Sequence, residues 1–131
     1  MLLGQGDSAV KYSYVLALIL IVQVISARAS EPCSVIHGRL HYYGGDGNLR
    51  LWHIGTHHEF EPADQDSWNR AFGWLTQGIW KDDSKNYASP ESNLMLYGDF
   101  TVCPAEPLHK GAVQAAWILK VTNKHYVRID P

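Results

Sequence analysis

Histidine is the residue whose number and spacing in this sequence most suggest chemistry. The chain of 131 residues contains 7 His, and two of them, His57 and His58, stand directly before Glu59. Imidazole and carboxylate groups placed together can bind a transition metal or act as an acid and base pair. If such a metal site forms, we expect it to be a cross-strand cluster of His53, His57, Glu59 and Asp99.

The spacing of the histidines argues against a simple metal site. His37 and His41 are four residues apart, which separates them by ~13 Å along a strand, and neighbouring residues such as His57 and His58 point to opposite faces of an extended chain. The sequence also lacks a His-Glu-x-x-His motif. The pattern therefore favours solvated or hydrogen-bonded surface histidines, and we expect no cofactor.

Motifs of covalent catalysis are missing as well. The sequence has no Gly-x-Ser-x-Gly elbow, and Cys33 and Cys103 do not form a Cys-x-x-Cys pair. The paired acids Glu59 and Glu61 fall in a segment typical of a sheet edge, where carboxylates usually solvate the surface. The sequence favours a protein without catalytic activity, and a small metal-dependent or hydrolytic enzyme with a His/carboxylate site is the alternative.

Cationic and aromatic side chains suggest ligand binding instead. We expect five of them to share one face of two neighbouring strands: His37, Arg39, His41, Arg50 and Trp52. Guanidinium and indole groups offer planar surfaces and paired donors, which suit a small molecule, a glycan or a protein partner. In the alternative interpretation, Trp52 packs under a helix and the two arginines pair with local carboxylates such as Asp99.

Two strands must position this face. Residues 34–43 alternate between apolar and polar side chains, and residues 48–54 follow after the turn of residues 44–47. A two- or four-residue turn places Arg39 opposite Trp52 and His41 opposite Arg50, whereas a three- or five-residue turn would reverse the two faces of the second strand. The predicted core face then holds Ile36, Leu40, Tyr42, Leu49 and Leu51.

The remaining segments predict one helix and more strands. Over residues 64–80 the apolar residues Trp68, Phe72, Leu75 and Ile79 recur at helical spacing, with a cap expected at Asp66 or Ser67. Residues 81–92 are polar and predict an exposed loop. Residues 94–103 alternate again, and residues 112–121 and 124–129 predict a hairpin that turns at Thr122-Asn123, with the odd-numbered apolar residues from Val113 to Val121 in register.

These elements predict a mainly β domain. Five strands and one short helix in about 100 residues favour a small closed barrel, because closure removes exposed sheet edges. If residues 59–61 form a short third strand, the order of three strands, a helix and two strands is that of an oligonucleotide/oligosaccharide-binding (OB-like) barrel. A β-sandwich is the alternative.

Three segments carry a resemblance to a known group of proteins. Residues 37–40 (HGRL), 49–56 (LRLWHIGT) and 98–104 (GDFTVCP) are similar to recurring segments of small exported bacterial proteins of unknown function. The resemblance covers most of residues 30–131 and implies an exported barrel-like domain. It implies no activity or catalytic residue.

The N-terminal residues predict export. An apolar run, residues 15–26, precedes Ala27-Arg28-Ala29, a small-x-small cleavage site, so residues 1–29 are interpreted as a signal peptide and residues 30–131 as a single domain. We expect a periplasmic or secreted protein that leaves the membrane after cleavage. An uncleaved segment that holds the protein at the membrane is the alternative.

The cysteines agree with that location. In an oxidising compartment the 2 cysteines, Cys33 and Cys103, should form a disulfide that brings the segment after Cys33 beside the segment before Cys103.

The overall composition excludes two classes of protein. A formal net charge of −2 without a long basic run excludes the electrostatic surface that nucleic acid requires. A hydrophobic content of 46% is too high for a disordered chain.

Overall fold

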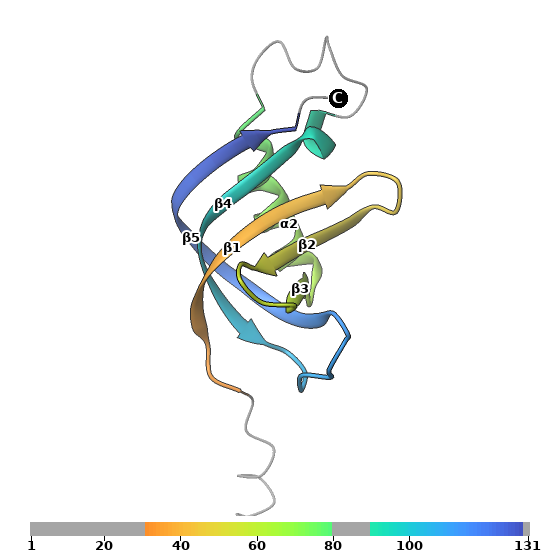
Figure 1. The fold of residues 1–131 in the computed structure, drawn as a ribbon, viewed down its shortest axis with the longest axis vertical. Helices are drawn as coiled ribbons and strands as arrows, with labels where there is room; N and C mark the ends of the chain where they lie inside the picture. Colours follow the sequence, from red (N-terminus) through yellow and green to blue (C-terminus); the bar gives the residue numbers. More distant parts are fainter. Residues whose placement is uncertain (1–30, 80–89, 130–131) are drawn as a thin grey trace, which may run out of the picture. The chain divides into compact units, whose positions relative to one another are not determined.

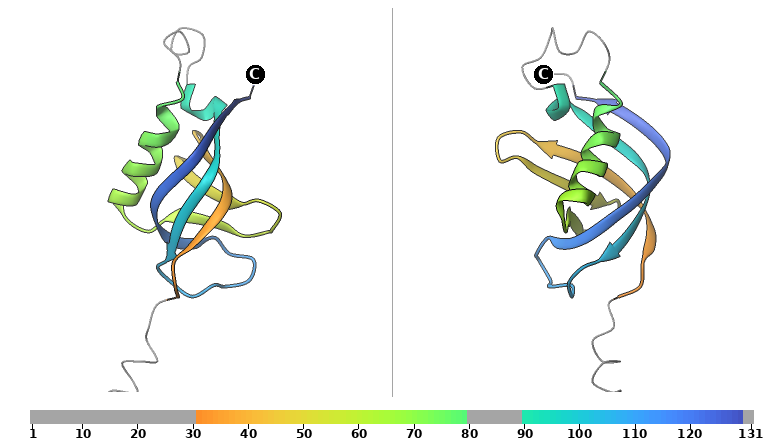
Figure 2. Two further views of the ribbon diagram at one scale, coloured as in Figure 1. Left: turned by 90° about the vertical axis from the view of Figure 1, so that its left-hand side faces the viewer. Right: turned by 180° about the vertical axis from the view of Figure 1, so that it is seen from behind.

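Five strands close into a barrel in the computed structural model, which describes residues 31–79 and 90–129. The strands are β1 (Ser34–Tyr43), β2 (Asn48–His53), β3 (Glu59–Pro62), β4 (Leu94–Pro104) and β5 (Gln114–Arg128). Their order around the barrel is β1-β2-β3-β5-β4 (Figure 1). A helix, α2 (Gln65–Thr76), connects β3 to β4 through a short 3-10 helix, η1 (Pro90–Asn93), and lies along one side of the barrel in both views of Figure 2.

The closed barrel confirms the predicted OB-like architecture over the sandwich. Three strands, a helix and two strands follow one another along the chain, and the short third strand exists. The predicted leader, residues 1–29, and most of the predicted polar loop, residues 81–92, lie outside the described residues. In the part of the chain that the structure describes, no helix is long and apolar enough to cross a membrane.

The register of β1 and β2 is the predicted one. A four-residue turn, in which Gly47 has a φ of 68°, joins the strands, and Arg39 faces Trp52 while His41 faces Arg50. Gly47 suits this position because a positive φ strains residues that have a Cβ. The predicted core face is confirmed, with four residues buried and Tyr42 partly buried against α2. The four are Ile36, Leu40, Leu49 and Leu51.

The helix begins earlier than the sequence predicted. Asp64, not Asp66 or Ser67, is the N-cap: its side chain accepts a hydrogen bond from the backbone N–H of Ser67 at 2.8 Å. This bond satisfies a free donor of the first turn and lowers the pKa of the Asp64 carboxyl. Ser67 is instead a buried first-turn residue whose hydroxyl accepts a hydrogen bond from the N–H of Ile118 on β5 at 3.3 Å.

The predicted hairpin at Thr122-Asn123 is wrong, because β5 is one continuous strand. Asp99 of β4 faces Thr122 and Tyr97 faces His125, so β5 holds one more residue than β4 between these pairs. Asn123, with a φ of 54°, lies in this irregularity. Residues that are typical of a tight turn therefore form a β-bulge here.

The bulges also decide which side of β5 faces the core. The even-numbered residues Gln114, Ala116 and Ile118 are buried, while Trp117 and Leu119 are exposed, opposite to the predicted register. The register shifts again between Thr101 and Val102 of β4. A shift of one residue moves the following side chains to the other face of the sheet.

Glycines allow β1 and its neighbours to come close where the barrel curves. Gly38 of β1 faces Gly98 of β4. A Cβ added at Gly98 would lie 2.9 Å from the carbonyl oxygen of Thr122, and one at Gly38 would lie 2.8 Å from the side chain of Leu51. Gly98 therefore requires glycine for space, because a backbone carbonyl lies against it, while at Gly38 the Leu51 side chain would have to shift.

The predicted disulfide between Cys33 and Cys103 is present. It joins residues 70 positions apart, beside the pair of Ser34 and Val102 at one end of the β1–β4 ladder. The segments after Cys33 and before Cys103 are therefore neighbours, as the sequence predicted. A disulfide of this kind is typical of proteins that fold in an oxidising compartment.

Candidate functional site

Cross-strand pairing aligns four side chains in a row on the outer surface of the barrel. Arg39 of β1 faces Tyr97 of β4 on one side and Trp52 of β2 on the other, and Trp52 in turn faces Glu59 of β3. All four are partly exposed. We call Tyr97, Arg39, Trp52 and Glu59 the central row.

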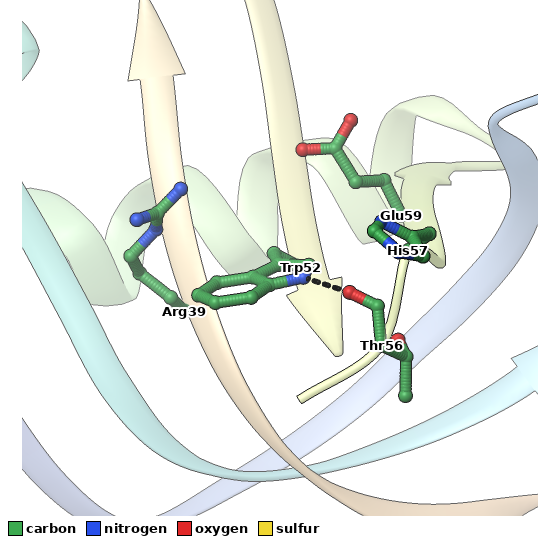
Figure 3. A pocket seen from close by; sticks show the side chains of 5 residues that line it. All are labelled: Arg39, Trp52, Thr56, His57 and Glu59. Carbon is green, nitrogen blue, oxygen red and sulfur yellow. Dashed lines mark hydrogen bonds between the residues drawn. The ribbon is translucent and has the colours of Figure 1, made fainter. Parts of the chain in front are cut away.

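An open pocket of about 370 Å³ lies over three residues of this row, Arg39, Trp52 and Glu59. Its lining consists of Arg39, Trp52, Thr56, His57 and Glu59 (Figure 3). The figure shows Arg39 on one side of the indole and His57 and Glu59 on the other. The volume is within the range of small-molecule sites, ~300–1,000 Å³.

Two contacts hold the Trp52 ring in place. The guanidinium carbon of Arg39 lies 4.8 Å from the ring centroid, which is a cation–π contact. The indole N–H donates a hydrogen bond to the carbonyl oxygen of Thr56 at 2.7 Å. Trp52 therefore lines the pocket in a defined orientation and does not belong to the buried core.

The loop between β2 and β3 supports this orientation. The Thr56 hydroxyl donates to the carbonyl of His53 at 2.7 Å and accepts from the N–H of His58 at 3.0 Å. Gly55, with a φ of 84°, makes the turn possible. Gly55 and Thr56 thus form a turn whose backbone holds Trp52.

Charges on either side of the central row are paired within the protein. Arg50 donates to Glu61 at 2.8 Å. Asp99 accepts from Asn123 at 2.7 Å and lies 3.2 Å from Nδ1 of His37. These bonds, with Asn123 the larger contributor, lower the pKa of Asp99. The alternative in which the arginines pair with local carboxylates is therefore met for Arg50, through Glu61, whereas Asp99 pairs with neither arginine.

His41 does not belong to the exposed face on which the sequence placed it. Its exposed fraction is 9%, and its ring meets that of Tyr43 edge-on at 4.5 Å between centroids. Burial, and secondarily the charge of Arg39, lowers the pKa of His41. His41 lies in register between Arg50 of β2 and Met95 of β4, so it has a neighbouring strand on both sides.

The four residues of the possible metal cluster are not brought together. His57 and Glu59 line the pocket, whereas Asp99 bonds to His37 and Asn123. Among residues 31–79 and 90–129, no group of three or more His, Cys, Asp or Glu side chains is arranged to hold a metal ion. A second pocket of about 220 Å³ has His57, His58 and His109 in its lining.

Of the five residues predicted to bind a ligand, the pocket contains two, Arg39 and Trp52. His37 and Arg50 lie on the same surface with their own partners. Sequence reasoning missed Thr56, and it considered Glu59 as a metal ligand or a solvated surface acid but not as a ligand-binding residue. Had the short third strand been paired with β2, its register would have placed Glu59 beside Trp52.

Comparison of the chain with family models, with curated proteins and with solved structures found no match in any of the three. The candidate function therefore depends on the geometry of the site itself.

Proposed function

We propose that this protein is an exported, non-catalytic binding module that holds a small polar molecule in the pocket over the central row. The observation that carries the proposal is the partly exposed indole of Trp52, oriented by Arg39 and by the Thr56 carbonyl. A fixed aromatic ring next to polar side chains is the usual composition of a small-ligand site. Because the ring is already ordered, a ligand loses little affinity to ordering it.

Export is part of the same proposal. The disulfide between Cys33 and Cys103 supports an oxidising compartment, and the apolar N-terminal run supports a cleaved leader. The resemblance to small exported bacterial proteins agrees with a periplasmic or secreted location. An enzyme with a His/carboxylate site is the weaker alternative, since only His57 and Glu59 of the four side chains considered for it line the pocket, and Asp99 is bonded to Asn123 elsewhere.

A ligand screen tests the proposal. The oxidised protein is screened by thermal shift against saccharides, short peptides and small organic acids, and each hit is titrated by calorimetry. We expect Trp52→Ala to abolish the binding of a true hit, with a small change in melting temperature because Trp52 lies outside the core cluster.

Trp117→Ala is the matched control. Trp117 is another partly exposed tryptophan, with 38% of its surface accessible, but it lies on β5 and not in the pocket lining. This variant should bind like the wild type. Unchanged affinity in Trp52→Ala would refute the site, and a collapse in its melting temperature would show that Trp52 is structural.

A further inference from the structure

The central row differs from its neighbours in how its charges are compensated. Arg50 is neutralised by Glu61, and Asp99 is bonded to His37 and Asn123. In contrast, neither Arg39 nor Glu59 forms an ion pair within the described part of the chain. One positive and one negative group of the same surface are thus left without a protein counter-charge.

The indole keeps these two groups apart. Trp52 faces Arg39 on one side and Glu59 on the other, so it occupies the position between them. Neighbouring strands are ~4.8 Å apart, which puts the Cα atoms of Arg39 and Glu59 about 10 Å from each other. The two opposite charges therefore flank a flat aromatic surface.

Arg39 in particular is prepared for an anion. Its Nε is buried without a hydrogen-bond partner, and its guanidinium is held over the Trp52 ring. Because Nε is shielded from solvent, an anion in the pocket would bind the terminal Nη groups of the guanidinium. A carboxylate suits a guanidinium because it accepts two parallel hydrogen bonds.

Glu59 requires the opposite chemistry. Its carboxylate only accepts hydrogen bonds, and it lies in the pocket lining next to Trp52. A primary ammonium group on the ligand would supply both the charge and the donors. A ligand with one charge would satisfy one side of the pocket and leave the other without a partner.

We infer that the pocket binds a small zwitterion, with a carboxylate for Arg39, an ammonium group for Glu59 and a flat or apolar body over Trp52. This inference rests on the proposed function and names the ligand class of the same site. Free amino acids and short peptides with unblocked termini belong to this class.

Four probes of one shape test the inference. 4-(Aminomethyl)benzoic acid carries both charges at opposite ends of a ring, its N-acetyl form is only an anion, its amide is only a cation, and the N-acetyl amide is neutral. Calorimetric titrations at low ionic strength limit screening of the exposed charges. We expect the zwitterion to bind about 5-fold more tightly than either singly charged probe, the upper range for a solvent-exposed ion pair.

Single substitutions that remove one charge each assign each preference to one residue. Glu59→Gln should abolish the preference for the zwitterion over the anion, and Arg39→Met should abolish the preference over the cation. Glu61→Gln is the matched control: it removes one negative charge from the same strand, but Glu61 pairs with Arg50 and lies outside the pocket lining. It should leave both preferences intact.

The possible failures are distinguishable. If the neutral probe binds as tightly as the zwitterion and Trp52→Ala abolishes that binding, the binding site stands and the zwitterion inference is refuted. The same holds if only uncharged saccharides bind in a Trp52-dependent way. If neither the probes nor any screened compound depends on Trp52, the inference and the proposed function fail together.

Discussion

Removal of the disulfide should cost this domain a large part of its stability. The bond between Cys33 and Cys103 spans 70 residues, so it constrains most of the described domain in the unfolded state. We consider the double substitution Cys33→Ser/Cys103→Ser. In the folded state, β1 and β4 stay paired next to the lost bond, from Ser34 and Val102 onward. The loss should therefore act mainly on the unfolded chain.

The magnitude follows from the length of the closed loop. On the chain-entropy model, a loop of this length lowers the entropy of the unfolded chain by about 15 cal/mol/K, or about 4 kcal/mol at 25 °C. A small domain has a total stability of about 5–15 kcal/mol. At about 4–8 °C per kcal/mol for a domain of this size, the melting temperature should fall by roughly 15–30 °C.

Urea unfolding, followed by circular dichroism, measures this effect. The free energy of unfolding is compared for the oxidised wild type, the wild type under reductant and the double serine variant. The two forms without the bond should agree with each other. Their unfolding slope m should exceed that of the oxidised protein, because the unconstrained chain exposes more surface. A double variant within about 1 kcal/mol of the oxidised protein would refute the reasoning.

Three further predictions concern the fold and its pH dependence. Gly98→Ala should lower the free energy of unfolding, measured with urea, by about 1–3 kcal/mol, because the added Cβ would press on a backbone carbonyl. Gly45 has open space around it, so Gly45→Ala should leave the stability nearly unchanged. Equal losses in the two variants would contradict the close packing at Gly98. Burial and the charge of Arg39 lower the pKa of His41 below 6.5, so stability should be complete above this pH and decrease as the pH falls through it, and His41→Phe should remove that slope. Parallel pH profiles for the two proteins would refute the assignment. The pKa of Asp99 is lowered, so the stability that its carboxylate contributes should be complete above pH 3.8 and should be lost as the pH falls through the folded-state pKa. The wild type and Asp99→Asn should therefore differ in free energy of unfolding at neutral pH and become equal in acid. A difference that stays constant with pH would contradict this.

The sequence alone was enough for the local structure of the first two strands. Alternation with a period of two, interrupted by the Gly-rich turn of residues 44–47, predicted both strands and, for a turn of two or four residues, the register and core face that the structure has. The apolar spacing of Trp68, Phe72 and Leu75 similarly predicted the helix, although it ends at Thr76 and does not reach Ile79 as expected. Such patterns can be recognised in a sequence because burial of one face of a strand or helix places apolar residues at the structural repeat of that element.

Long-range pairing decided what the local pattern could not. Thr122-Asn123 has the composition of a turn, but β4 pairs with β5 on both sides of it, so the chain continues through a bulge. The bulges then determine which β5 residues face the core. Local propensity is too weak to predict such an outcome against the hydrogen bonds of a long ladder.

The candidate site was likewise predicted only in part from the sequence. Arg39 and Trp52 were recognisable from the sequence because their residue types and the β1–β2 register place them together. Which charges remain available for a ligand was decided only by the tertiary structure: Glu61 neutralises Arg50, while Trp52 lies between Arg39 and Glu59. Residue types define what chemistry is possible, and the distances between side chains on different strands, which no local pattern encodes, determine which groups are left to perform it.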